Sequence, residues 1–315
     1  MYRKIEIVGM RKDRDKKIVF AIIIFSIIGI IASLGFIFYN KHKIVEASAQ
    51  NTNVITEEVS MSDNSANIEG KSDNAEDKEV SNSQPSDDAN GNKQISEDAQ
   101  KFIDSVKNIY NGTDGKRVFL TFDDGPTKEV TPHILDILDK YNIKATFFVL
   151  GTRVEQNPDI LKREYDSGHY IANHSFSHKY SSIYKSADSV LEEYNRTENA
   201  IRVALGNNSY SSNLFRFPGG SYGGQYEKIK KEARKKLNEN GIAYLDWSAL
   251  TYDAEGAKTK DAILSNLKET INGWDNVVIL MHDAADKKIT YETLEDVIKY
   301  LQGKGYNFKN IYDIM

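Results

Sequence analysis

From residue 116 onwards the sequence predicts an α/β fold, in which parallel strands form a sheet or barrel covered by helices. Two observations carry this prediction. Apolar runs of strand length alternate with segments of helical periodicity, and the runs are apolar on both faces of the expected strand. Strands buried on both faces, with a helix between each pair, are typical of parallel sheets. Seven strands in ~200 residues are few for an eight-stranded barrel of about 250 residues.

The elements follow from the positions of these patterns. The predicted strands lie at residues 118–122, 145–150, 170–173, 214–217, 243–247, 277–281 and 308–312. The predicted helices between them lie at residues 132–140, 158–167, 187–205, 226–240, 261–272 and 291–303. Pro132 suits a first helical turn, because its missing N–H would have no partner there, and Gly241 and Gly303 suit helix ends. A short helical lead-in is expected within residues 99–115, before the folded domain of residues 116–315.

The N-terminal part has a different organisation. Residues 18–39 carry no charged side chain and are dominated by Ile and Phe. At helical rise this length covers ~30 Å of hydrocarbon, so we expect a transmembrane helix rather than the shorter apolar region of a signal peptide. The preceding arm, residues 1–17, holds seven Lys or Arg and is expected to be cytoplasmic. The rest of the chain would then lie outside the membrane.

Residues 40–98 are predicted to be a disordered acidic spacer. From residue 44 to residue 98 there is no aromatic residue, and thirteen acidic residues stand against three lysines. Such a segment buries too little apolar surface to fold. The net charge of the whole chain is −5, and the excess of acidic residues lies in this spacer. The part of the chain after residue 98 is therefore near neutral, which argues against a nucleic-acid partner. The absence of cysteine excludes disulfides and thiol nucleophiles, and no obligate protein partner is evident.

Ionisable residues, or Gly and Pro, follow five of the predicted strands. Because the carboxyl ends of parallel strands share one edge, these residues are expected to face one site. The five positions are Asp123-Asp124, His174 to His178, Arg216 to Gly220, Asp246 to Asp253, and His282-Asp283.

A metal site can be built from three of these side chains. His174 and His178 are four residues apart, so a helical turn would present both imidazoles on one face. With Asp124 the set becomes two His and one carboxylate, which leaves a coordination position open for water. An acidic surface turn and a surface histidine pair remain the alternatives at this point.

The other residues suit acid–base chemistry. Asp123, covalently beside Asp124, could accept a proton from water, and His282 could protonate a leaving group. Arg216 could pair with Asp123 and hold it ionised. The backbone of Gly219 and Gly220 could approach a substrate closely and offer an N–H to an oxyanion.

Taken in order, these motifs resemble the polysaccharide deacetylases of carbohydrate esterase family 4, also called the NodB homology domain. They are TFDDGP ending at Pro126, HSxxH from His174, RxPGG from Arg216 and LxH from Leu280. The resemblance covers residues 116–315 and implies a deformed (β/α)7-type barrel. It implies zinc, or a related divalent ion, on Asp124, His174 and His178, with Asp123 as general base and His282 as general acid. Arg216 would orient the base, and Leu280 would line the pocket for the acetyl methyl group.

Another motif of the family corresponds to residues 247–254, between RxPGG and LxH, and there the chain departs from the family's common pattern. Asp253 aligns with the aspartate that tunes the acid histidine, but Ala254 stands where many members have a pocket tryptophan. Whether Trp247 or Trp274 compensates is open. The remaining substrate-binding candidates follow Arg216; they are Pro218, Gly219, Gly220 and Tyr222.

The resulting expectation is a membrane-tethered, extracytoplasmic, metal-dependent deacetylase. Its substrate would be an N-acetylated cell-envelope glycan, either N-acetylglucosamine or N-acetylmuramic acid of peptidoglycan, or a chitin-like polymer. An O-acetyl esterase acting on a xylan-like glycan and an inactive glycan-binding module are the alternatives. Two His and one carboxylate also ligate iron in non-haem oxygenases, but the paired aspartates and the β/α alternation argue against that class.

Overall fold

The computed structural model describes residues 95–315. The predictions for the basic arm, the transmembrane helix at 18–39 and nearly all of the spacer therefore lie outside the described residues. Within residues 95–315, none of the helices has both the length and the apolar character needed to span a bilayer. The first described helix begins at Glu97, one residue before the predicted end of the spacer.

The core of the fold is one sheet in which every recorded strand pair is parallel. Its strands are β1 (Arg117–Asp123), β2 (Thr146–Val149), β3 (Tyr170–Asn173), β4 (Leu214–Phe215), β5 (Ala243–Tyr244), β6 (Ala249–Leu250), β7 (Asn276–His282) and β8 (Asn307–Lys309). The order across the sheet is β5-β4-β3-β2-β1-β7-β6, and β8 pairs with the first half of β1. The sheet is curled but does not close between β5 and β6, so the predicted deformed barrel is confirmed in part, as a half-barrel.

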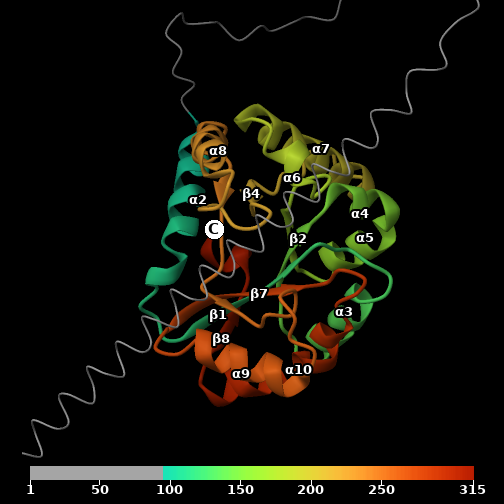
Figure 1. The fold of residues 1–315 in the computed structure, drawn as a ribbon, viewed down its shortest axis with the longest axis vertical. Helices are drawn as coiled ribbons and strands as arrows, with labels where there is room; N and C mark the ends of the chain where they lie inside the picture. The colour runs from blue at the N-terminus through green and yellow to red at the C-terminus, as the bar shows by residue number, and fades with distance from the viewer. Residues whose placement is uncertain (1–94) are drawn as a thin grey trace, which may run out of the picture. The chain divides into compact units, whose positions relative to one another are not determined.

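Helices cover the outer face of this sheet (Figure 1). They are α3 (Thr131–Lys140), α4 (Gly151–Gln156), α5 (Pro158–Asp166), α6 (Tyr180–Ile183), α7 (Ala187–Leu205), α8 (Glu227–Glu239), α9 (Lys260–Thr270) and α10 (Lys288–Gly303). Local chemistry explains their ends. The Ser186 side chain accepts a hydrogen bond from the Ser189 amide at the start of α7, and Gly206 ends this helix in the left-handed conformation.

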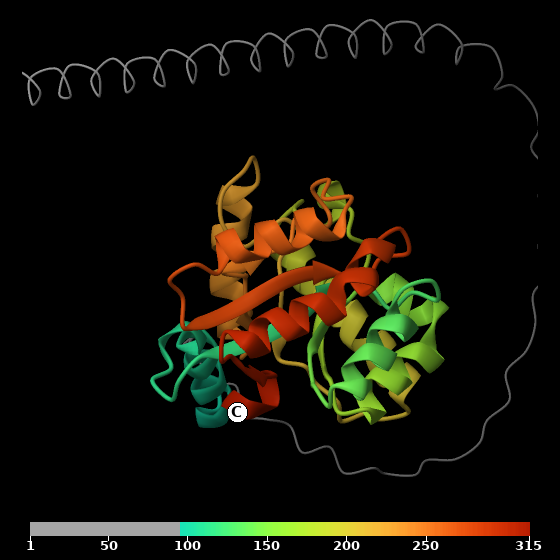
Figure 2. The same cartoon turned by 90° about the horizontal axis from the view of Figure 1, so that it is seen from below.

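The two faces of β1 enter two separate hydrophobic clusters. Leu120 and Phe122 point outward into the cluster that contains α3 and α10. Phe119 points inward, where it meets Phe148 and the helix α2 (Glu97–Lys107). Phe102, Ile103 and Val106 of α2 are buried there, so this helix and the 3₁₀ turn η1 (Ile109–Asn111) close the base of the half-barrel. Figure 2 shows α2 in teal beside the β1 strand that it covers.

The predicted elements differ from the observed ones where the segments are short. The strand β6 and the helices α4 and α6 have two to six residues each, too few for a periodic pattern, so the sequence did not predict them. The last predicted strand, 308–312, is strand only as far as Lys309. From Ile311 to Ile314 the chain forms a 3₁₀ turn that a capping box at Asn310 begins.

Candidate active site

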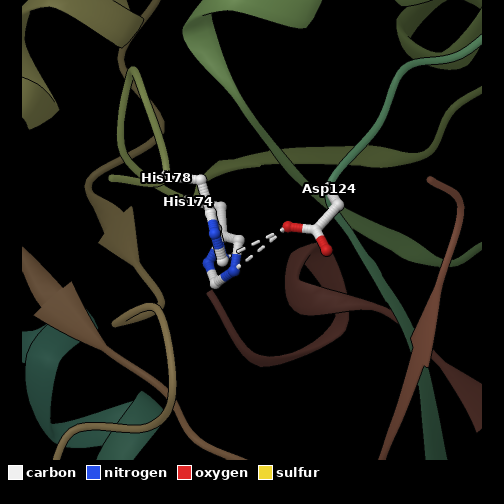
Figure 3. Close-up of side chains that lie close together, drawn as sticks. All are labelled: Asp124, His174 and His178. Atoms are coloured by element: carbon white, nitrogen blue, oxygen red, sulfur yellow. Dashed lines mark ion pairs between the residues drawn. The ribbon is translucent and has the colours of Figure 1, made fainter. Parts of the chain in front are cut away.

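The three predicted metal ligands come together at the carboxyl edge of the sheet (Figure 3). Asp124 follows β1, and His174 follows β3. Asp124 Oδ1 lies 3.7 Å from His174 Nε2 and 3.4 Å from His178 Nε2. His174 is buried, whereas His178 and Asp124 are partly open to solvent.

The prediction that the two histidines share a helical turn is wrong. Residues 174–179 form a loop, with Ser175 and His178 at φ values of 77° and 55°. Glu193 of α7 holds this loop, because its carboxylate accepts the amides of Phe176 and Ser177 at 2.9 and 2.7 Å. The imidazoles therefore converge through loop geometry that the four-residue spacing alone does not specify.

The donor set fits a divalent metal ion. Asp124 Oδ1 is buried and has no hydrogen-bond partner within residues 95–315, which costs free energy unless a cation compensates. The Nδ1 atom of His174 donates to the Arg216 carbonyl at 2.8 Å, so its Nε2 lone pair faces Asp124. Burial lowers the pKa of His174 to about 3, which keeps the ring neutral. Ligand atoms around a tetrahedral ion at ~2.0–2.1 Å lie about 3.4 Å apart, close to the observed separations.

Asp123 is buried beside the ligands and is paired with Arg216. Arg216 Nη1 donates to Asp123 Oδ1 at 2.8 Å and to Thr121 Oγ1 at 2.7 Å. Burial raises the pKa of Asp123, and the Arg216 charge opposes that rise. The guanidinium, itself fully buried, lies 3.9 Å from the ring centroid of Phe148, which fixes its plane.

His282 lies opposite Asp123 in the register of the neighbouring strands β1 and β7. Asp253 holds this histidine at two points. One carboxylate oxygen accepts the His282 amide at 2.7 Å, and the other lies 3.0 Å from His282 Nδ1. Burial alone would lower the pKa of His282, but the hydrogen bond and the charge of Asp253 raise it to about 9. The same contacts outweigh burial at Asp253 and lower the pKa of that carboxyl.

The predicted substrate-binding residues differ in their surroundings. Leu280 is buried on β7, two residues before His282 and so on the same strand face. The Pro218 carbonyl accepts the Tyr184 hydroxyl at 2.6 Å. Tyr222 is 64% exposed, and its ring packs under the Arg234 guanidinium on α8.

The two glycines are not equivalent as oxyanion donors. The Gly220 amide donates to the Phe217 carbonyl at 2.8 Å and is not free, which corrects that half of the prediction. The Gly219 amide has no hydrogen-bond partner within residues 95–315, so it is the available donor of the pair. A Cβ atom on Gly219 would overlap the Tyr180 hydroxyl, and its φ of 72° also favours glycine.

Trp247, rather than Trp274, lies beside the candidate site. It is half-buried, with the Arg216 guanidinium 5.8 Å from its ring centroid, and its ring meets the Cβ position of Gly220. Trp274 is half-exposed near the other end of β7. Ala254 lies in an exposed turn and contributes no pocket wall.

Asp283, for which the sequence pattern predicts no role of its own, organises the DDGP turn. Its carboxylate accepts the Thr131 hydroxyl at 2.6 Å, its amide donates to the Asp123 carbonyl, and a Cβ on Gly125 would overlap it. Burial raises the pKa of Asp283 to about 7. In the sequence, an acidic residue directly after a motif histidine looks the same whether it anchors a buried turn or lies in a surface turn. Only the structure therefore identifies the role of Asp283.

Asp246 has a comparable role on the other side of the site. Its carboxylate accepts the amide and the hydroxyl of Ser221, and thereby holds the Gly219-Gly220 turn. Its backbone carbonyl accepts Arg216 Nη2 at 3.2 Å.

A curled parallel sheet that carries these side chains at its carboxyl edge defines the polysaccharide deacetylase class of hydrolases. The comparisons with known proteins agree: the model of the polysaccharide deacetylase family matches residues 110–244.

The chain belongs to this family, as its relatives show. It is 31% identical to the peptidoglycan-N-acetylmuramic acid deacetylase PdaA of Bacillus subtilis, over 64% of this chain and 73% of that protein. It is 32% identical to the peptidoglycan-N-acetylglucosamine deacetylase PgdA of Listeria monocytogenes, over 66% of this chain but only 41% of that protein. A carbohydrate esterase family 4 esterase of Streptococcus mutans superposes with a TM-score of 0.60 at 34% identity, covering 66% of this chain and 90% of that one.

Proposed function

We propose that the chain is a metal-dependent deacetylase that removes N-acetyl groups from peptidoglycan. The observation that carries the proposal is that the buried Asp124 Oδ1 has no hydrogen-bond partner among residues 95–315 and lies between two imidazole nitrogens, with a paired carboxylate and a His–Asp pair beside it. The names of the relatives support a peptidoglycan substrate for this chain.

Asp124, His174 and His178 would hold the ion, and zinc is the expected metal because imidazole and carboxylate suit it. A divalent ion supplies Lewis acidity, which activates water near neutral pH and polarises a carbonyl oxygen. Asp123 would accept a proton from the attacking water. Its Oδ1 is engaged by Arg216, which leaves Oδ2 available for that proton.

His282 would act as the acid. Asp253 occupies its Nδ1, so Nε2 faces the departing group, and the raised pKa keeps the ring protonated near neutral pH. The oxygen of water bonds to the acetyl carbon, the C–N bond breaks, the sugar nitrogen takes the proton of His282, and acetate leaves. The Gly219 amide, which has no partner among the described residues, would donate to the developing oxyanion.

The deciding experiment measures acetate released by the purified full chain from peptidoglycan, chitin oligomers and acetyl-xylan, each with and without chelator. We expect release from peptidoglycan that chelation abolishes and added zinc restores. Release from acetyl-xylan alone would instead assign an O-acetyl esterase. A metal-loaded chain that releases no acetate from any of the three would be a glycan-binding module.

We also propose that residues 18–39 anchor the chain in the cell membrane, with the catalytic domain outside and residues 40–98 as its tether. The support is the uncharged apolar run after a basic arm and the acidic composition of the spacer. Protease added to intact cells should remove the catalytic domain; protection until the cells are lysed would refute this orientation.

A further inference from the structure

A cavity of about 750 Å³ opens beside two of the candidate metal ligands, Asp124 and His178. Its other wall is formed by α4 and α7, which pack side by side (Figure 1). We call this cavity the α4–α7 groove. It is lined by Asp124, Leu150, Thr152, Arg153, Gln156, Phe176, Ser177, His178, Lys179, Ser182, Glu193, Arg196 and Ala284.

Three cationic side chains of this groove form no ion pair with any residue between 95 and 315. The guanidinium of Arg196 lies 3.8 Å from the ring centroid of Phe176, and Arg196 is exposed. Arg153 donates to the neutral Gln156 side chain at 3.0 Å. Lys179 is exposed in the loop of the ligand histidines.

The acidic side chains of the groove are already engaged. Both oxygens of Glu193 accept hydrogen bonds from the 176–177 loop, including the Ser177 hydroxyl at 2.9 Å, and Asp124 belongs to the metal set. Other acids, Asp188 and Glu192 among them, line a separate cavity of about 540 Å³, which shares Phe176 and Arg196 with the groove. The stacked side chains of Phe176 and Arg196 therefore lie between two cavities. The α4–α7 groove, next to the candidate metal ligands, is cationic, and the second cavity is acidic.

We propose that the α4–α7 groove is a carboxylate subsite, in which Arg153, Lys179 and Arg196 bind an acidic substituent next to the acetylated sugar. An arginine held flat on an aromatic ring keeps its fork of donors oriented for a carboxylate. This inference rests on the proposed function and narrows it. The substrate is an anionic amino-sugar glycan, and its carboxylate distinguishes it from a neutral N-acetylglucosamine polymer.

The test compares two acetylated oligomers of equal length with the purified full chain. One carries muramic carboxylates, and the other has the same carboxyl groups converted to methyl amides. We expect wild type to show a KM at least 10-fold lower for the acid, because only the carboxylate accepts charge-assisted hydrogen bonds from the cationic side chains. The double variant Arg153→Gln/Arg196→Gln should lose this preference, because its KM for the acid should rise to the value for the amide.

Arg163→Gln is the matched control, because Arg163 is a partly exposed arginine on α5 that pairs with Asp136, outside the groove. It should keep the preference for the acid. Equal KM values for acid and amide in wild type would overturn the proposal, as would a double variant that still prefers the acid. If wild type releases no acetate from any substrate, the proposed function fails. Calorimetric binding of the acid and the amide to wild type and the double variant then decides the subsite alone.

Discussion

Asp253 binds His282 through both the backbone amide and the imidazole, at 2.7 and 3.0 Å. Thr290 completes the arrangement by donating its hydroxyl to the same carboxylate at 2.8 Å. The aspartate therefore fixes which ring nitrogen faces the cleft and also sets the proton affinity of the ring. Asp253 therefore keeps the contact that raises the pKa of His282, although the next residue, Ala254, stands where many family members have a tryptophan.

The first prediction concerns pH. The pKa of His282 is raised to about 9, so the acid is protonated below that pH and activity should fall above it. Asp253→Asn removes the charge but leaves the burial, so the alkaline limb of kcat should move down by more than about one pH unit. A profile of kcat from pH 5 to 10 checks this, and an unmoved limb would contradict the tuning role.

The same contact has a stability consequence. Because the folded-state pKa of His282 lies above its ordinary value near 6.5, the contact stabilises the fold fully below about pH 6.5 and loses that effect as pH rises through 9. Asp253→Asn should therefore lower the unfolding midpoint most at pH 6 and least at pH 10. Denaturant unfolding at both values measures the difference, and Asp296→Asn on α10 serves as a control for an acid away from the histidine.

The second prediction separates base from ligand. Asp123→Asn should lower kcat by about 10²–10⁴-fold, because the proton acceptor is lost, while metal content stays at the wild-type level. Elemental analysis and acetate release on one preparation give both values. Asp136→Asn, an acid on α3, is the control. Full activity in the Asp123 variant would remove this residue from the mechanism.

The third prediction concerns the metal. His178→Ala should lose most of the bound metal, and the melting temperature of the variant should no longer rise when zinc is added. His133→Ala is a matched control, because that imidazole packs against Tyr291, 4.6 Å between ring centroids, away from the ligand set. Unchanged metal content in the His178 variant would refute the ligand assignment.

The fourth prediction concerns Arg216 as a positioning residue. Its guanidinium donates to Thr121, Asp123 and two backbone carbonyls, a set that one ammonium group cannot satisfy. Arg216→Lys should lower kcat by about 10–100-fold with little change in KM, because Asp123 is misoriented while the substrate groove is intact. An equal change in both constants would indicate a general disturbance of the site.

The motif residues could be placed from the sequence because five apolar strands each end in chemistry-bearing residues. Parallel strands bring those ends together whatever the loop details. Long elements such as α7 were predicted with their observed bounds, since nineteen residues carry a clear period. The local route from β3 to His178 could not be predicted, because it depends on Glu193, fifteen residues further along the chain.

Asp283 and the groove arginines illustrate the same limit. Their roles arise from contacts between segments far apart in sequence: Asp283 with Thr131, and Arg196 with Phe176. A single charged residue has no periodicity, so the sequence cannot distinguish a buried turn anchor from a solvated side chain. Only the packing of the helices against the sheet decides it.

Because α2 closes the base of the half-barrel, it determines where a recombinant fragment should begin. The family match starts at residue 110 and so leaves out α2. Every candidate metal ligand also lies after this helix. A fragment cut at residue 110 or 116 would expose Phe119, Phe148 and Val278 to water, and such apolar surface promotes aggregation. Expression should therefore start before Ser96, the residue whose side chain caps the helix.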